Sequence, residues 1–294
     1  MESKVSVVIP VYNGERFILE AVESALEQDY DNLEIVIVDD ASTDNTYAIL
    51  LENFGDLIGK KIIYHRNEKN MERAFSRNKG VQLAGGDYIF FLDYDDRWKR
   101  DYIKSSVGYL QEHDIVYSFP RTFIDEDGNT VRVSRKEIPS LEGIIFSGLI
   151  GYPSGTGVRK DRFHGYRDRY LIREDWEFFI RAYLDGQKIK LLDNNMVLMR
   201  EHRGRTSRNL QFYRATLTVF RDYYNLIPDE YRPDFMFHTG EVALRFGDII
   251  LGWKLVLKAI SSKPSILKDR RKLLSVLKRG IRFDRALRFS GSNK

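Results

Sequence analysis

Short runs of β-branched residues alternate with amphipathic segments over the first 92 residues of this chain of 294. The segment from Glu15 to Gln28 has apolar residues at three- and four-residue spacing, which predicts a helix. Runs that predict strands stand on either side of it, at Val5–Ile9 and Glu34–Val38. Two strands joined by a helix form a βαβ unit, whose strands are parallel and whose sheet is covered on both faces.

The alternation continues with a predicted helix at 46–54, a strand at 61–65, a helix at 71–84 and a strand at 88–92. After residue 100 the pattern loosens to a strand at 115–119, a hairpin turn at 125–129 and a helix at 173–184, and from Leu210 onward it is mostly helical. We therefore expect an α/β domain over residues 1–208, with a Rossmann-like, mostly parallel central sheet flanked by helices, and a helical C-terminal extension over 209–294.

Three polar clusters follow strands of this predicted sheet, at 10–13, 39–44 and 93–96. Ligands of open α/β sheets bind at the carboxyl ends of the strands. Acidic residues at two strand ends of one sheet edge therefore indicate a site. Asp and Ser residues before a helix are also N-caps, and we expect both roles in the cluster at 39–44.

Asp93 and Asp95, in Asp93-Tyr94-Asp95-Asp96, are predicted by strand pleating to point to the same side of the chain. Two converging carboxylates suit a hard divalent cation, Mg²⁺ or Mn²⁺, whose other ligands would be the phosphate oxygens of a leaving nucleoside diphosphate. The competing interpretation is that an Asp-x-Asp motif after a strand only solvates a loop.

The chain contains no cysteine, which excludes disulfides, thiolate metal ligands and thiol nucleophiles. No run approaches the roughly 18 to 20 apolar residues of a membrane-spanning helix, so we expect none. The apolar run that begins at Val5 is too short for a secretory signal. We therefore expect a cytoplasmic protein.

Four successive segments resemble the motifs of the inverting glycosyltransferases of family 2, which have the GT-A fold. They are, in order, Val7-Val-Ile-Pro-Val-Tyr-Asn13, Val38-Asp-Asp-Ala-Ser-Thr-Asp44, Arg77-Asn78, and Phe91-Leu-Asp-Tyr-Asp-Asp96 with Trp98. The resemblance covers roughly residues 4–205 and implies that residues 1–208 are a GT-A catalytic domain. The sequence departs from the family at Met71-Glu-Arg, where a turn with glycine is common.

The resemblance also implies roles for individual residues. The nucleoside pocket would be lined by Pro10, Val11 and Tyr12. Asp40 would accept a hydrogen bond from the base, and Arg77 would lie near the nucleotide. Asp93 would face the ribose and, together with Asp95, would bind the metal ion. The alternative for Arg77 is a pair with acidic neighbours at the helix surface, which would contribute only about 0–1 kcal/mol.

Asp175, in the pair Glu174-Asp175, matches the aspartate that the family is taken to use as its catalytic base. A base is required because the acceptor hydroxyl must lose its proton as it attacks the anomeric carbon. The alternative is that acidic residues in a first helical turn only interact with the helix dipole. His202 matches a late segment in which a histidine approaches the diphosphate or the metal, and Arg200, Arg203 and Arg205 around it suit phosphate charge. A polar surface residue is the other interpretation of His202.

Residues 254–294 hold thirteen Lys or Arg against two Asp, whereas the whole chain has a net charge of only +4. If residues 265–283 form one helix, apolar side chains share one face and basic side chains the other. Such a helix either packs on the domain or binds an anionic membrane surface. We hypothesise peripheral attachment to the inner face of the cell membrane, and we expect no binding of nucleic acid.

The sequence thus predicts a metal-dependent, hexosyltransferase-like enzyme. It would move a sugar from a UDP-, GDP- or dTDP-linked donor to a sugar or lipid-linked acceptor, in the synthesis of a surface polysaccharide or another glycoconjugate. A nucleotidyltransferase is the alternative enzyme, but it would be expected to have a glycine-rich, basic phosphate loop after the first strand, where this chain has Pro10-Val-Tyr-Asn-Gly14. A non-catalytic binder of nucleotide sugars is the third candidate, and it should have lost the acidic residues that this chain retains.

Overall fold

The computed structural model describes residues 2–135, 137–202, 209–269, 273–276 and 278. In this part of the chain the main sheet has seven strands in the order β10-β6-β9-β4-β1-β2-β3. Their bounds are β1 (Val5–Val11), β2 (Leu33–Asp39), β3 (Ile62–Arg66), β4 (Tyr88–Phe91), β6 (Ile115–Ser118), β9 (Thr156–Arg159) and β10 (Ile189–Leu192). The pairs β1–β2, β1–β4, β2–β3 and β6–β10 are parallel, while β9 pairs antiparallel with both β4 and β6.

Both faces of the sheet are buried, because alternate residues of its strands enter two different hydrophobic clusters. On β1, Val7 and Ile9 belong to the cluster that includes helix α1, and Val8 belongs to the cluster that includes helices α3 and α6. The helices of this part are α1 (Ile18–Leu26), α2 (Thr46–Phe54), α3 (Glu72–Leu83), α4 (Tyr102–Val107), α5 (Leu141–Phe146) and α6 (Glu174–Leu184). The predicted α/β class with helices on both faces of a mostly parallel sheet is confirmed.

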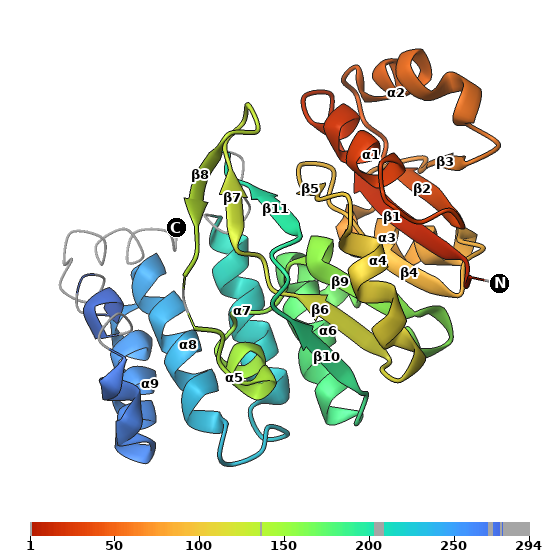
Figure 1. Ribbon diagram of the computed structural model, residues 1–294. Helices are drawn as coiled ribbons and strands as arrows, with labels where there is room; N and C mark the ends of the chain where they lie inside the picture. Colours follow the sequence, from red (N-terminus) through yellow and green to blue (C-terminus); the bar gives the residue numbers. More distant parts are fainter. Residues whose placement is uncertain (1, 136, 203–208, 270–272, 277, 279–294) are drawn as a thin grey trace.

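A second, smaller sheet lies beside the first and was not expected from the sequence (Figure 1). Its order is β5-β11-β7-β8, with bounds β5 (Arg97–Trp98), β7 (Thr122–Ile124), β8 (Thr130–Val133) and β11 (Val197–Arg200). The predicted hairpin turn at 125–129 is confirmed, since it joins the antiparallel strands β7 and β8. Asp125 fixes this turn by accepting hydrogen bonds from the backbone N–H groups of Asp127 and Asn129.

The C-terminal part is helical, as predicted, with α7 (Leu210–Tyr223), α8 (Arg232–Phe246) and α9 (Ile249–Ser262) lying side by side (Figure 1). These helices share a core with the sheet domain: Phe235 of α8 packs against Trp176 of α6, with ring centroids 5.3 Å apart. The division of the chain into domains at residue 208 stays a prediction.

The predicted helix over 265–283 falls largely outside the described residues. Its first part belongs to a short 3₁₀ helix, η7 (Pro264–Lys268), so a continuous α-helix does not begin at residue 265. Among the described residues, no helix is long and apolar enough to cross a membrane.

Candidate active site

A cleft of about 540 Å³ opens at the carboxyl ends of β1, β2 and β4. Its lining includes nine residues that were predicted for the site: Pro10, Val11, Tyr12, Asp40, Arg77, Asp93, Asp95, Asp175 and His202. They come from distant parts of the sequence, since Pro10 and His202 are 192 positions apart along the chain. The structure therefore brings the predicted residues together in one place, while their individual roles stay predictions.

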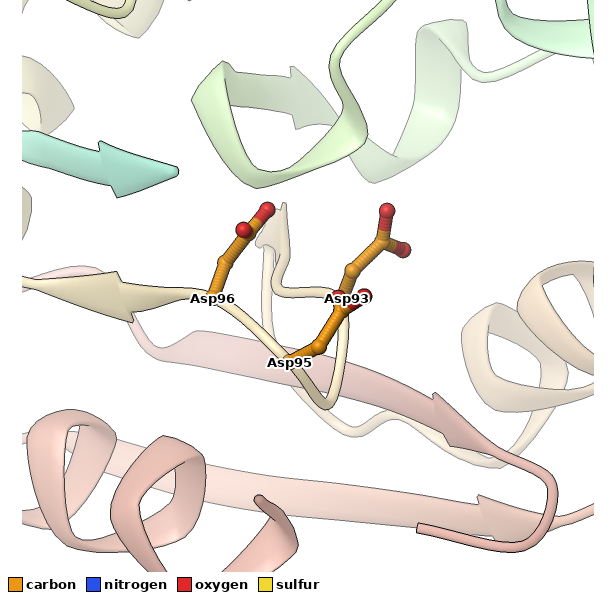
Figure 2. A group of neighbouring side chains, drawn as sticks. All are labelled: Asp93, Asp95 and Asp96. Carbon is orange, nitrogen blue, oxygen red and sulfur yellow. The ribbon is translucent and has the colours of Figure 1, made fainter. Parts of the chain in front are cut away.

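Three carboxylates converge on the loop that follows β4. Asp93, Asp95 and Asp96 each offer an oxygen, and these oxygens all lie within 4.8 Å of one another. Figure 2 shows the three side chains gathered on one loop. A tight turn, in which Asp96 N donates to Asp93 O over 3.0 Å, brings them together. A cluster of carboxylate oxygens is the donor set that Mg²⁺ and Mn²⁺ prefer, so the residues present fit such an ion.

Asp96 differs from the other two because it is buried and already hydrogen-bonded. Its carboxylate accepts hydrogen bonds from Ser154 Oγ over 2.5 Å and from the backbone N of Arg200 over 2.9 Å. Burial, and then the charges of Asp95 and Asp93, raise the pKa of Asp96 well above the usual range of a carboxyl group. Asp96 thus fixes the loop, and Asp93 and Asp95 present the more exposed oxygens to the cleft.

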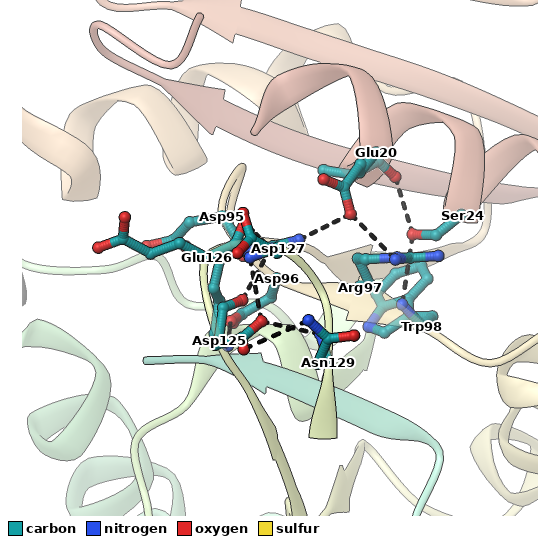
Figure 3. Close-up of polar contacts among 12 residues, drawn as sticks. Glu20, Ser24, Asp95, Asp96, Arg97, Trp98, Asp125, Glu126, Asp127 and Asn129 are labelled. Atoms are coloured by element: carbon teal, nitrogen blue, oxygen red, sulfur yellow. Dashed lines mark hydrogen bonds and ion pairs between the residues drawn. The ribbon is translucent and has the colours of Figure 1, made fainter. Parts of the chain in front are cut away.

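Arg200 anchors the same loop from β11. Its buried guanidinium donates to Asp95 O, pairs with Glu20 of α1 at 2.9 Å, and donates to the carbonyl oxygens of Asp125 and Glu126 in the β7–β8 turn. Figure 3 shows Glu20 of α1, Asp95 of the acidic loop and Asp125 of this turn close together. This gives Arg200 a structural role, since Nε, Nη1 and Nη2 each donate within the protein, while its expected contribution to a basic surface for phosphate stays a prediction. Residues 203 and 205 lie outside the described part.

His202 follows Arg200 and contacts the acidic loop, with its Nε2 2.9 Å from Asp95 Oδ2. Its ring packs on Phe17, with centroids 5.6 Å apart. The side chain is only 15% exposed. This burial argues against an ordinary surface histidine and places the imidazole beside the proposed metal ligands.

Arg77 joins three elements that are distant in the sequence. Its guanidinium on α3 donates to Asp93 Oδ1 over 2.7 Å and to Glu174 Oε1, at the start of α6, over 2.8 Å. The side chain is 2% exposed, so the interpretation of Arg77 as part of a weak surface pair is wrong. Burial alone would lower its pKa, but the charges of Asp93 and Glu174 outweigh burial and raise it.

Asp40 is held at the end of β2, at the side of the cleft formed by β1 and β2. Its Oδ1 accepts hydrogen bonds from Asn67 Nδ2 over 2.7 Å and from the backbone N of Met71 over 2.8 Å. Glu72, at the position where the family commonly has a glycine-containing turn, has a φ of 69°, in the region that favours glycine. The backbone thus keeps a turn of that kind without the glycine.

Asp175 occupies the first turn of α6, and it is partly buried. Its pKa is raised to about 7, first by burial and then by the charge of Glu174, with Arg173 and Arg77 acting in the opposite direction. The backbone of Gly151, which has a φ of 112°, lies directly against this carboxyl: a Cβ on Gly151 would come within 3.1 Å of it. A carboxyl whose pKa lies near neutrality can take up a proton at physiological pH.

Helices α7 and α8 complete the cleft, which was not predicted from the sequence. Their contribution is Phe212, His238, Glu241, Val242 and Arg245. Helical spacing predicted these helices but could not show which of their faces meets the cleft.

Comparison with known proteins agrees with this arrangement. The sequence model of the family described as Glycosyl transferase family 2 matches residues 6–174. The chain is also similar to the UDP-Glc:alpha-D-GlcNAc-diphosphoundecaprenol beta-1,3-glucosyltransferase WfaP of Escherichia coli. The two are 30% identical over 216 residues, which cover 70% of this chain and 80% of that protein.

Two solved structures have the same fold. One is TarS 1-349 of S. aureus in complex with UDP-GlcNAc, with a TM-score of 0.63, 18% identity, and coverage of 94% of this chain and 89% of that chain. The other is the mannosyltransferase PcManGT of Pyrobaculum calidifontis in complex with GDP-Man and Mn²⁺, with a TM-score of 0.62, 17% identity, and coverage of 94% and 81%. The predicted GT-A fold is confirmed.

Replacing Arg77 with Met would leave the buried Glu174 and the partly buried Asp93 without their shared cation. We expect Arg77→Met to lower the free energy of unfolding by about 3–5 kcal/mol, as measured by urea denaturation. Arg159→Met is the control, since it removes an exposed pair with Asp161 and should cost at most about 1 kcal/mol. Similar losses in the two variants would contradict the central role of Arg77.

Proposed function

This chain belongs to glycosyl transferase family 2, and we propose on that basis that it transfers a sugar from a nucleoside diphosphate sugar to a hydroxyl group of an acceptor in the synthesis of a surface polysaccharide or glycoconjugate. The observation that carries the proposal is the cleft in which the acidic loop after β4, the strand ends of β1 and β2, and the partly buried Asp175 meet. Transfer from a nucleotide sugar needs all three: a place for the nucleoside, positive charge beside the diphosphate, and a base that takes the proton of the acceptor hydroxyl.

The donor would lie along the β1, β2 and β4 side of this cleft. In this proposal the nucleoside rests against Pro10, Val11 and Tyr12, with Asp40 beside the base and Arg77 near the nucleotide. Asp93 and Asp95 would hold Mn²⁺ or Mg²⁺, as the hard oxygen donors of the loop favour. The ion would supply positive charge that stabilises the leaving diphosphate. In support, one structure of the same fold contains Mn²⁺ together with GDP-Man.

Asp175 would act as the base from the opposite side of the sugar. The acceptor oxygen forms a bond to the anomeric carbon while the bond from that carbon to the diphosphate oxygen breaks. The hydroxyl proton passes to the carboxylate of Asp175, and the nucleoside diphosphate leaves with the bonding electrons. Since the attacking oxygen and the leaving group are on opposite faces, the anomeric configuration inverts. His202, in contact with Asp95, would approach the diphosphate.

We further propose that the protein works at the inner face of the cell membrane on a lipid-linked acceptor. Helix α9 supports this, because Ile250 and Leu257 are 86% and 59% exposed. Lys254 and Lys258 are exposed on the same helix and would face anionic headgroups. The similar enzyme of Escherichia coli is named for a diphosphoundecaprenol-linked acceptor, which is a lipid of this kind.

Asp175→Asn removes the proton acceptor and keeps the shape of the side chain. We expect donor affinity in isothermal titration to change little, and the rate of transfer to fall by about 10²- to 10⁴-fold. Because the active form is deprotonated and the pKa is raised to about 7, log kcat/KM of the wild type should rise with pH up to about 7 and then level off. Asp185→Asn, at the exposed other end of α6, is the control. Full activity in Asp175→Asn would remove the base assignment.

Metal dependence is tested by chelation and by Asp95→Asn. We expect EDTA to abolish transfer and Mn²⁺ or Mg²⁺ to restore it. The Mn²⁺ concentration that gives half-maximal activity should rise at least about tenfold in Asp95→Asn, since even changes around a metal's direct ligands cost about 10- to 100-fold. Asp127→Asn, in the exposed β7–β8 turn, should behave as the wild type. Undiminished activity in EDTA would rule out a metal-dependent reaction.

Flotation with liposomes tests the membrane proposal. The full chain should float with vesicles that contain anionic lipid, and the double variant Ile250→Glu/Leu257→Glu should not, because it places negative charge on the exposed face of α9. Leu226→Glu changes an equally exposed leucine outside α9 and should leave flotation intact. Equal flotation of all three proteins would exclude α9 from membrane binding.

A further inference from the structure

Arg173, the residue before α6, is a buried cation that forms no ion pair with a carboxylate among the described residues. The other buried arginines of the described chain, Arg77, Arg181 and Arg200, each pair with an Asp or Glu. Arg173 is 6% exposed, its Nε has no hydrogen-bond partner among the described residues, and its Nη2 lies 2.9 Å from His238 Nε2. Burying a charge without an ion-pair partner costs free energy, so this arrangement favours the binding of an anionic group.

Two aromatic rings hold the guanidinium in place. Its central carbon lies 4.0 Å from the ring centroid of Trp176 and 4.6 Å from that of Phe212. Contacts of this kind use the faces of the planar group and leave its N–H edge for hydrogen bonds. Because a guanidinium only donates, His238 Nε2 accepts in the contact between them. Burial lowers the pKa of Arg173 to about 10, which leaves it charged at neutral pH.

Arg173 lines the cleft together with Asp175, at the side that α7 and α8 complete. The other charged or titratable side chains on this side of the cleft are Tyr152, His238, Glu241 and Arg245. Gly148, which has a φ of 64°, packs directly against His238, since a Cβ at this position would lie 2.2 Å from His238 Nε2. The nucleoside segments of β1 and β2 lie at the other end, so a group bound at Arg173 would not belong to the nucleoside.

We propose that Arg173 binds a phosphate group of the acceptor, on the α7–α8 side of the reacting hydroxyl. This inference rests on the proposed function and specifies its acceptor as a sugar joined through phosphate or diphosphate to a lipid. A phosphate oxygen takes the N–H edge of the guanidinium, supplies the missing negative charge, and sets the distance from the lipid linkage to Asp175. A neutral saccharide would leave that cation unpaired.

Binding of decyl diphosphate tests the proposal without knowledge of the acceptor sugar. It is titrated calorimetrically into the full chain saturated with nucleoside diphosphate and Mn²⁺, and release of the nucleotide is followed in parallel. The wild type should bind decyl diphosphate without releasing nucleotide. Arg173→Met should weaken this binding by about 10- to 100-fold, the range of a charge-assisted hydrogen bond. Arg173→Lys, which keeps the charge, should weaken it less.

Arg169→Gln is the matched control, since Arg169 is exposed nearby, pairs with Asp222 and should have no effect. Thermal unfolding establishes whether each variant is folded. If Arg173→Met is not folded, the binding of decyl diphosphate by Arg173→Lys is compared with that by the wild type instead. The proposal is overturned if decyl diphosphate binds only by displacing nucleotide, or if the folded Arg173 variants bind it as the wild type does. Binding of inorganic pyrophosphate but not of decyl diphosphate would also overturn an acceptor role. A wild type that binds no nucleoside diphosphate would instead contradict the proposed function itself, and this inference with it.

Discussion

The geometry of the cleft depends on one buried ion triad, in which Arg77 lies between Asp93 and Glu174. Buried ion pairs add little net stability compared with well-packed apolar groups, but removing one partner is costly because the other charges stay buried. The triad fixes α3, the loop after β4 and the first turn of α6 relative to one another. It therefore sets where Asp95 and Asp175 stand, although neither belongs to the triad.

The electrostatics of the two ends of the cleft follow from how each charge is compensated. Asp93 is partly neutralised by Arg77, and Asp95 contacts His202. Asp175 is partly buried beside the charge of Glu174 and forms no ion pair in the described part of the chain, so its pKa moves toward neutrality. The cleft thus contains Asp93 and Asp95, whose carboxylates suit a cation, and Asp175, whose raised pKa suits proton transfer. The difference between them arises from burial and ion pairing.

Local patterns in the sequence were sufficient to predict the helices and strands in the half of the fold that contains the family's four motifs. The predicted helix at 46–54 is found unchanged as α2, and the predicted strands are found with ends that differ by one or two residues. The acidic loop and Asp175 were placed in one site through the family resemblance, and the cleft contains both. The structural role of Arg200 was missed because its partners lie up to 180 positions away, at Glu20 and in the β7–β8 turn. Strand β9 and the cleft face of α8 were missed for the same reason, since long-range pairing leaves no periodic signal at short range.

The position of β9 has a consequence for how the molecule assembles. It is the antiparallel strand between β4 and β6, so the main sheet cannot close until the chain has been made as far as Arg159. The wall formed by α8 requires synthesis up to Phe246. Segments near the N-terminus fold first during translation, and contacts of large sequence separation form late because loop closure costs entropy. The order of assembly therefore runs from the β1 and β2 side of the cleft to the α7 and α8 side, and the cleft is completed last.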